Sequence, residues 1–316
     1  MTMPSTSAGA SDSPPAEAEQ RPAATPAPTP AALTDNPGPG LLLQLGGPLQ
    51  SWGEHSAFAD RDTVAHPTRS GLIGMIASAF GIPRADATVA TGSRFAQLTR
   101  LRFTVRTDRP GTRLIDFHTV GGGLPQHRTV PTAKGGRRPA EGATIVSRRH
   151  YLSDAVFTVA VTAPDATTAT LLTDCAEALA APRWPLHQGR RSCPPGALFL
   201  LRPDSPDPLA ELLQLPLARP APANGDSEVA TVTVYFTADT PFAQTPEAAS
   251  PCGTAATMLN DEPVCLASRD RVHRTRPAYT TSRDLPATRC GGYGTAYLDA
   301  LNTYLKQNTR PEEATP

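Results

Sequence analysis

Arginine is the residue that could do most of the chemistry in this sequence. Residues 98–151 hold ten arginines and one lysine against Asp108, Asp116 and Glu141, a local net charge of +8 in a chain whose formal net charge is zero. A guanidinium binds phosphate through two parallel hydrogen bonds and also stacks on nucleobases. The block therefore predicts a surface for a polyanion such as nucleic acid, with a solvated charged loop as the alternative.

Histidine is the residue type that could support acid–base catalysis in the same region. His118, His127 and His150 are compatible with a metal-independent ribonuclease, and the alternative for each is a surface or hydrogen-bonding role. The sequence has no phosphate-binding loop, HExxH, EF-hand, zinc-type Cys/His spacing or GxSxG elbow, and its carboxylates are scattered. We therefore expect no catalytic residue, no metal and no cofactor.

Two short segments in the first third of the chain have the residue types of an RNA site. Arg69 and Ser70 open a predicted helix, where free N–H groups favour a phosphate; the alternative is an N-cap and a surface charge. Gln50, Ser51 and Trp52 follow a predicted strand and could hold bases, whereas the alternative makes Trp52 a core anchor.

Two later segments combine arginine with an aromatic residue or a tight loop. Arg148, Arg149 and Tyr151 enter a predicted strand, where Arg149 and Tyr151 share a face. This face could bind RNA by stacking and charge, and the alternative is an ordinary edge strand. Arg190 and Arg191 lie in a Gly/Pro loop whose backbone N–H groups could clamp RNA, with a solvent-exposed pair as the alternative.

The elements that must position these residues begin with a strand, a polar loop and a helix. Residues 41–45 form an apolar run of strand length that Gly46, Gly47 and Pro48 end. Apolar residues at helical spacing over 67–80 predict an amphipathic helix that Thr68 or Ser70 can cap and Gly81 can close.

The rest of the first 203 residues continues this pattern. Alternation predicts a half-buried strand over 98–107, with Arg100, Arg102, Thr104 and Arg106 forming a basic face. A long excursion at 112–149 follows a DRPG turn and fits a functional loop or an extended hairpin. The order strand, helix, strand, insertion, strand, helix, strand is the ferredoxin-like pattern of RNA-recognition domains. Its last three elements are a strand at 150–162, a helix at 166–181 and a strand at 197–202.

Six segments in this order carry a family resemblance over roughly half of the chain. They are GPLQSWG (47–53), PTRSGLIGMIASAFGIPR (67–84), VRTDRPG (105–111), DFHTVGGG (116–123), SRRHYLSDAVFTVAV (147–161) and PRWPLHQGRRSCPP (182–195). The sequence resembles the CasD family, the subtype I-E member of the fifth Cas-protein family within the RAMP superfamily.

This resemblance implies a function as well as a fold. It implies a non-catalytic subunit of the CRISPR surveillance complex Cascade, which grips the five-prime handle of the crRNA in antiviral defence and caps the backbone filament. The 112–149 excursion then corresponds to a thumb hairpin that reaches over the RNA. The implied partners are crRNA, the CasC backbone subunit and the CasA large subunit, with target DNA met only through the complex. Together with the resemblance, the residues singled out above give the predicted RNA contacts: Gln50, Ser51, Trp52, Arg69, Ser70, His118, Arg148, Arg149, Tyr151, Arg190 and Arg191.

Composition completes the expected domain organisation. We expect a disordered Pro/Ala-rich tail at 1–40, a ferredoxin-like α+β domain at 41–203, a small β-rich lobe at 204–305 and a polar tail at 306–316. Five cysteines without a C-x-x-C pair, no apolar run of membrane-spanning length and no secretion signal indicate a cytoplasmic protein.

Overall fold

The computed structural model describes residues 32–308 apart from 35–37, 55, 58, 133, 197, 223–229, 244–254 and 268–269. The predicted tails therefore lie largely outside the described residues, at 1–31 and 309–316. None of the described helices is long and apolar enough to cross a membrane.

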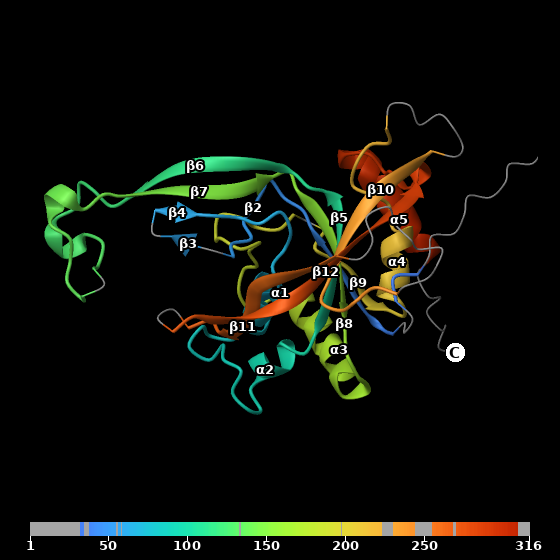
Figure 1. Cartoon of the computed structure of the whole chain (residues 1–316), viewed down its shortest axis with the longest axis horizontal. Helices are drawn as coiled ribbons and strands as arrows, with labels where there is room; N and C mark the ends of the chain where they lie inside the picture. The colour runs from blue at the N-terminus through green and yellow to red at the C-terminus, as the bar shows by residue number, and fades with distance from the viewer. Residues whose placement is uncertain are drawn as a thin grey trace, which may run out of the picture.

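A seven-stranded sheet runs through the whole molecule (Figure 1). Every neighbouring pair of strands in it is antiparallel, which makes the fold a mixed α+β one with a mainly antiparallel sheet. The strand order is β11 (Ala255–Cys265), β12 (Val272–Pro286), β10 (Thr231–Ala238), β5 (Arg102–Arg109), β8 (Val156–Thr162), β1 (Gly40–Leu45) and β9 (Leu200–Ser205).

Helices cover both faces of this sheet. Alternate residues of β1 enter different cores: Leu41 and Leu43 join a cluster with α1 (Arg69–Phe80), α2 (Arg94–Leu98) and α3 (Ala166–Ala180), whereas Leu42 joins one with α4 (Pro208–Gln214) and α5 (Gly294–Gln307). A strand buried on both sides needs the near-continuous apolar sequence GLLLQL that β1 has. RNA-recognition domains stack bases on an open sheet face. Helices cover both faces of this part of the sheet, so bases cannot stack on it.

The predicted basic face of the strand at 98–107 is wrong for Thr104 and Arg106, which are buried, whereas Arg100 and Arg102 are exposed. Arg106 is fully buried: its Nε donates to Asp108 Oδ1 at 2.6 Å, and its other nitrogens reach backbone carbonyls after α4, among them Leu215 O at 2.9 Å. The carboxylate of Asp108 lies two residues along the same face, and that pairing makes burial of the charge tolerable. The expected strand also starts later, at Arg102, because residues 94–98 form α2.

The 112–149 excursion forms most of a two-stranded hairpin that leaves the body of the molecule (Figure 1). β6 (Thr112–Val120) pairs antiparallel with β7 (Ile145–Ser153) along its full length. β7 continues a small second sheet with β2 (Leu49–Gln50), β4 (Asp60–Arg61) and β3 (Ser56–Ala57). The single strand expected at 150–162 is two strands, β7 and β8, separated at Asp154, which has a φ of 57°.

The expected C-terminal lobe does not stand apart from the main sheet. β10 pairs with β5, so β10, β12 and β11 extend the sheet that begins in the N-terminal half. Between β9 and β10 the chain forms α4, which begins at Pro208 and has Asp207 as its N-cap.

Candidate nucleic-acid interface

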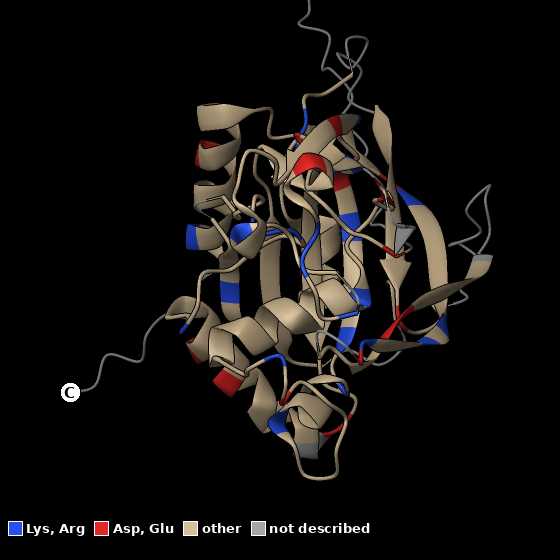
Figure 2. Ribbon diagram, turned by 90° about the vertical axis from the view of Figure 1, so that its left-hand side faces the viewer, with Lys and Arg blue, Asp and Glu red and all other residues tan. Residues whose placement is uncertain are grey.

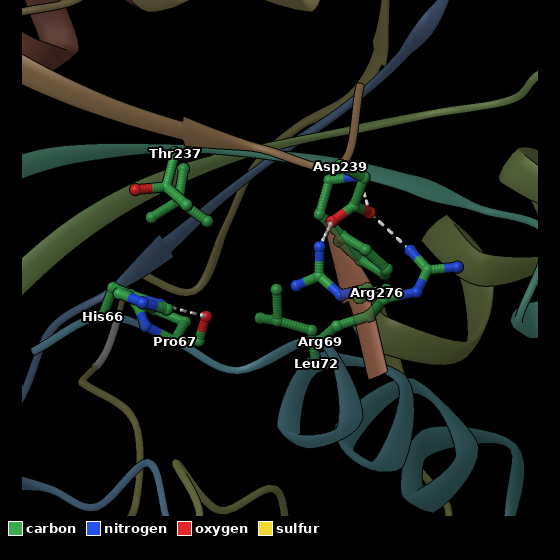
Figure 3. A pocket seen from close by; sticks show the side chains of 9 residues that line it. His66, Pro67, Arg69, Leu72, Thr237, Asp239 and Arg276 are labelled. Carbon is green, nitrogen blue, oxygen red and sulfur yellow. Dashed lines mark hydrogen bonds and ion pairs between the residues drawn. The ribbon is translucent and has the colours of Figure 1, made fainter. Parts of the chain in front are cut away.

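The start of α1 is closed by acidic residues that lie in β11 or directly after β10, and Figure 3 shows one of them, Asp239, paired with Arg69 and Arg276. Arg69 is 7% exposed, and its guanidinium pairs with Asp239 and with Glu262. The same guanidinium donates to the carbonyls of Leu101, at 2.8 Å, and Thr99. Four of the five guanidinium N–H groups donate to partners inside the protein, so Arg69 is held by its own chain rather than presented to a phosphate, contrary to the prediction.

The anion expected at the helix start is a side chain of the protein itself. Oδ2 of Asp261 accepts from the Arg69 backbone N–H at 2.7 Å, which places a carboxylate at the positive end of α1. Arg276 joins Asp261 to Asp239 with N···O distances of 2.7 and 2.9 Å. Burial raises the pKa of Asp239, while Arg69 and Arg276 oppose this rise. Ser70 follows in the first turn and is half-buried.

Gln50, Ser51 and Trp52 are interior residues. The Gln50 side chain donates to the carbonyls of Leu45 (3.0 Å) and Ala155 (2.8 Å) and accepts from the Trp52 ring N–H at 2.9 Å. Trp52 is almost fully buried and packs so closely on α1 that a Cβ at Gly71 would lie 2.9 Å from its ring. The core-anchor alternative therefore describes Trp52 in this structure, and the three residues position the loop after β1.

The root of the hairpin is fastened by the loop that carries Arg190. Arg190 donates to the carbonyls of His150 at 2.6 Å and Arg61 at 2.9 Å, and its guanidinium carbon lies 4.8 Å from the centre of the Tyr151 ring. The loop reaches this position because Gly189 has a φ of 90°, and a Cβ there would lie 1.7 Å from the Ser51 carbonyl oxygen. Tyr151 is thus stacked on an arginine of its own chain.

Side chains further out on β7 and β6 are more open. Arg148 is 65% exposed at its side chain and shares Asp60 with His150, at 2.9 Å each. Arg149 makes one weak side-chain hydrogen bond, from Nε to Ser147 Oγ at 3.3 Å. His118 on β6 faces Asp116 at 3.1 Å, and both side chains are 40% exposed.

The hairpin tip is basic and exposed. Its cations have no carboxylate partner within the part of the chain that the structure describes, and Glu141 is the single acidic residue of the segment 121–144. Figure 2 shows the molecule from the side toward which the hairpin projects, with lysine and arginine in blue. Arg191, in the loop at the hairpin root, is exposed as well. The tip cations are Arg128, Lys134, Arg137 and Arg138.

The structure therefore divides the eleven predicted RNA contacts. It brings Arg148, Arg149, Tyr151, Arg190 and Arg191 to the hairpin and its root. His118 lies on β6 of the hairpin, opposite Ser147 of β7. The structure leaves Gln50, Ser51, Trp52 and Arg69 buried in the body, and Ser70 half-buried beside Arg69 in α1. The partners that decide this, Asp60, Asp239, Asp261 and Glu262, carry no motif, and sequence reasoning missed them. No group of His, Cys, Asp or Glu that could hold a metal ion occurs among the described residues.

Known proteins place this chain in a family. The model of the family described as CRISPR-associated protein (Cas_Cas5) matches residues 40–227, more than half of the chain. The CRISPR system Cascade subunit CasD of Escherichia coli (strain K12) is 36% identical over 183 residues, covering 55% of this chain and 75% of that protein.

A solved structure agrees with the sequence relatives. A chain of a CRISPR RNA-guided surveillance complex superposes with a TM-score of 0.69 at 45% identity, covering 85% of this chain and all of that chain. Sequence, family model and fold thus lead to one conclusion: the chain belongs to the CRISPR-associated Cas5 family, with CasD among its relatives.

Proposed function

We propose that this protein is the CasD-type subunit of a type I-E Cascade and that it holds the five-prime handle of crRNA without cleaving it. Its relatives are a Cascade subunit and a chain of an RNA-guided surveillance complex. The observation that carries the proposal is the projecting β6–β7 hairpin, whose tip cations have no acidic partner among the described residues. Unneutralised arginines on an extended arm suit the electrostatic binding of a single-stranded RNA backbone.

The arrangement of the central strands supports the ferredoxin-like part of this proposal. β9, β1, β8 and β5 lie side by side in that order, and in chain order they are the fourth, first, third and second strands of the pattern β1-α1-β5-β8-α3-β9. The hairpin inserts between the second and third of these strands, where a thumb can extend without disturbing the sheet.

A binding role also fits the two histidines considered for catalysis. His150 and His118 are each paired with one aspartate, Asp60 and Asp116 respectively. The Nδ1 atom of His150 is buried without a hydrogen-bond partner in the described structure. Each histidine thus has an aspartate partner within its own chain, which supports a binding role over acid–base catalysis.

The partners follow from the proposed place in the complex. The hairpin would contact crRNA and a neighbouring CasC backbone subunit, and CasA would dock nearby. Base pairing by the guide would supply target specificity, so target DNA is met only through the complex.

The proposal is tested with a handle oligonucleotide and a full repeat RNA, both in EDTA. We expect tight, salt-dependent binding of the handle and no cleavage of the repeat. The charge-reversal variant in which Arg138, Arg149 and Arg191 are all replaced by Glu should lose measurable handle binding and keep an unchanged melting temperature. Cleavage of the repeat that disappears in His118→Ala or His150→Ala would replace the clamp with an enzyme.

A further inference from the structure

β6 is an open edge of the hairpin sheet. All nine of its residues pair with β7 on one side, and no described strand lies along its other side. A strand edge of this length leaves a row of backbone N–H and C=O groups that water or another chain must satisfy. Its sequence, TRLIDFHTV, has no proline or lysine of the kind that usually discourages pairing.

One face of the hairpin beside this edge is apolar and exposed. Phe117 is 71% exposed, the highest value among the large apolar side chains of the described chain, and Ile115 on the same face is 58% exposed. Val146 is 43% exposed, and its position on β7 is two residues from Arg148, which lies opposite Phe117. Three adjacent apolar side chains in water are unfavourable for a free surface and typical of a protein contact.

The charges on this face also restrict what can cover it. On β6, alternate residues place Arg113 and Thr119 beside Ile115 and Phe117, so this strand contributes a cation and no acid to the face. The nearby Arg148 is bound to Asp60. A covering segment with apolar side chains and a carboxylate would match the face, whereas an RNA strand would leave Ile115 and Val146 in contact with sugar and phosphate.

From these features we infer that a neighbouring protein subunit adds an extended segment to the free edge of β6. That segment continues the β-ladder through its backbone and covers Ile115, Phe117 and Val146 with alternate apolar side chains. Strand addition satisfies the backbone groups and the apolar side chains together, which a helix or an RNA strand cannot do. The inference rests on the proposed function, because the neighbouring subunit is a component of the same complex.

Amide hydrogen exchange on peptides covering β6 tests the backbone part directly. We expect exchange in the assembled complex to be slower than in the free chain by about tenfold or more. Contact through side chains alone would not protect the outward amides. Unchanged exchange of β6 in an otherwise complete complex overturns the inference.

A photoreactive phenylalanine analogue in place of Phe117 tests the nature of the partner. A crosslink to a protein subunit supports strand addition, whereas a crosslink only to RNA, or a dimer of the free chain joined through β6, overturns it. The double variant Ile115→Asp, Phe117→Asp should weaken subunit association by about tenfold or more. Met258→Asp is the matched control, since Met258 is 62% exposed on the edge strand β11.

Handle binding by the free chain separates the two hypotheses. If the free chain binds the handle and the double variant binds it equally well, loss of subunit association is assigned to the β6 edge. If the free chain fails to bind the handle, the proposed function fails, whatever the exchange rates on β6.

Discussion

The start of α1 and the β6–β7 hairpin use the same residue type in opposite ways. At the start of α1, Arg69 and Arg276 are enclosed with three carboxylates and form a buried ion cluster. On the hairpin, Arg128 and Arg138 stand in solvent with no acidic partner among the described residues. An arginine that fastens the fold and an arginine that is open to a ligand are therefore distinguished by the acids around them.

Those acids come from far away in the chain. Asp239, Asp261 and Glu262 lie 170 to 193 residues after Arg69 and reach it only because β10 and β11 join the main sheet. Local charge density in the sequence therefore identifies an exposed basic hairpin, but it cannot identify a buried cluster whose acids are distant in the chain.

The largest change in stability is expected from Arg69→Ala. Removing the guanidinium leaves the carboxylates of Asp239 and Glu262 buried with one fewer counter-charge. We expect the free energy of unfolding to fall by about 3–5 kcal/mol, measured by urea denaturation.

The exposed pair of Arg94 and Asp174 provides the control for that variant. Its N···O distance is 2.7 Å, but both side chains are more than 40% exposed. Arg94→Ala should therefore cost at most about 1 kcal/mol. Equal losses in the two variants would show that the start of α1 is not the tightly coupled cluster described.

A medium effect is expected from Gln50→Ala inside the body. The substitution removes two hydrogen bonds to the backbone and leaves the Trp52 ring N–H unpaired and buried. We expect a loss of about 1–3 kcal/mol in unfolding free energy and unchanged affinity for RNA in the folded fraction. Weaker RNA binding with no change in stability would instead make Gln50 a residue that touches RNA.

The smallest change in stability is expected from substitutions on the hairpin, which should instead weaken RNA binding. Arg128→Ala with Arg138→Ala removes two exposed cations. The unfolding free energy should change by no more than about 0.5 kcal/mol. The slope of log affinity against log salt should become shallower by about 0.7 for each phosphate that the variant no longer neutralises. An unchanged slope would show that the tip does not touch the RNA backbone.

Elements with strong local patterns could be predicted from the sequence. The apolar run of β1, the helical spacing of α1 and its closing Gly81, with a φ of 73°, agree with the structure. The family resemblance is confirmed by the match to residues 40–227. For the long 112–149 excursion, the extended-hairpin interpretation is the one that the structure bears out, with β6 and β7 as its strands.

Features set by distant contacts could not be predicted. Leu42 and Leu43 look alike in sequence, yet they enter different cores because α4 and α5 cover the second face of the sheet. The alternating sequence pattern predicted that Arg106 is exposed, but Asp108 and the backbone carbonyls after α4 enclose its side chain. The short helices α2 and α4 have too few turns to show a period.

The pairing of β10 with β5 has a consequence for anyone who wishes to shorten this protein. The family match ends at residue 227, just before β10 begins at Thr231. A chain cut there would expose the flank of β5 and leave Arg69 without a counter-ion, since its acids belong to the discarded segment. Expression fragments should therefore keep the C-terminal strands, and a viable minimal version would need a neutral residue at position 69.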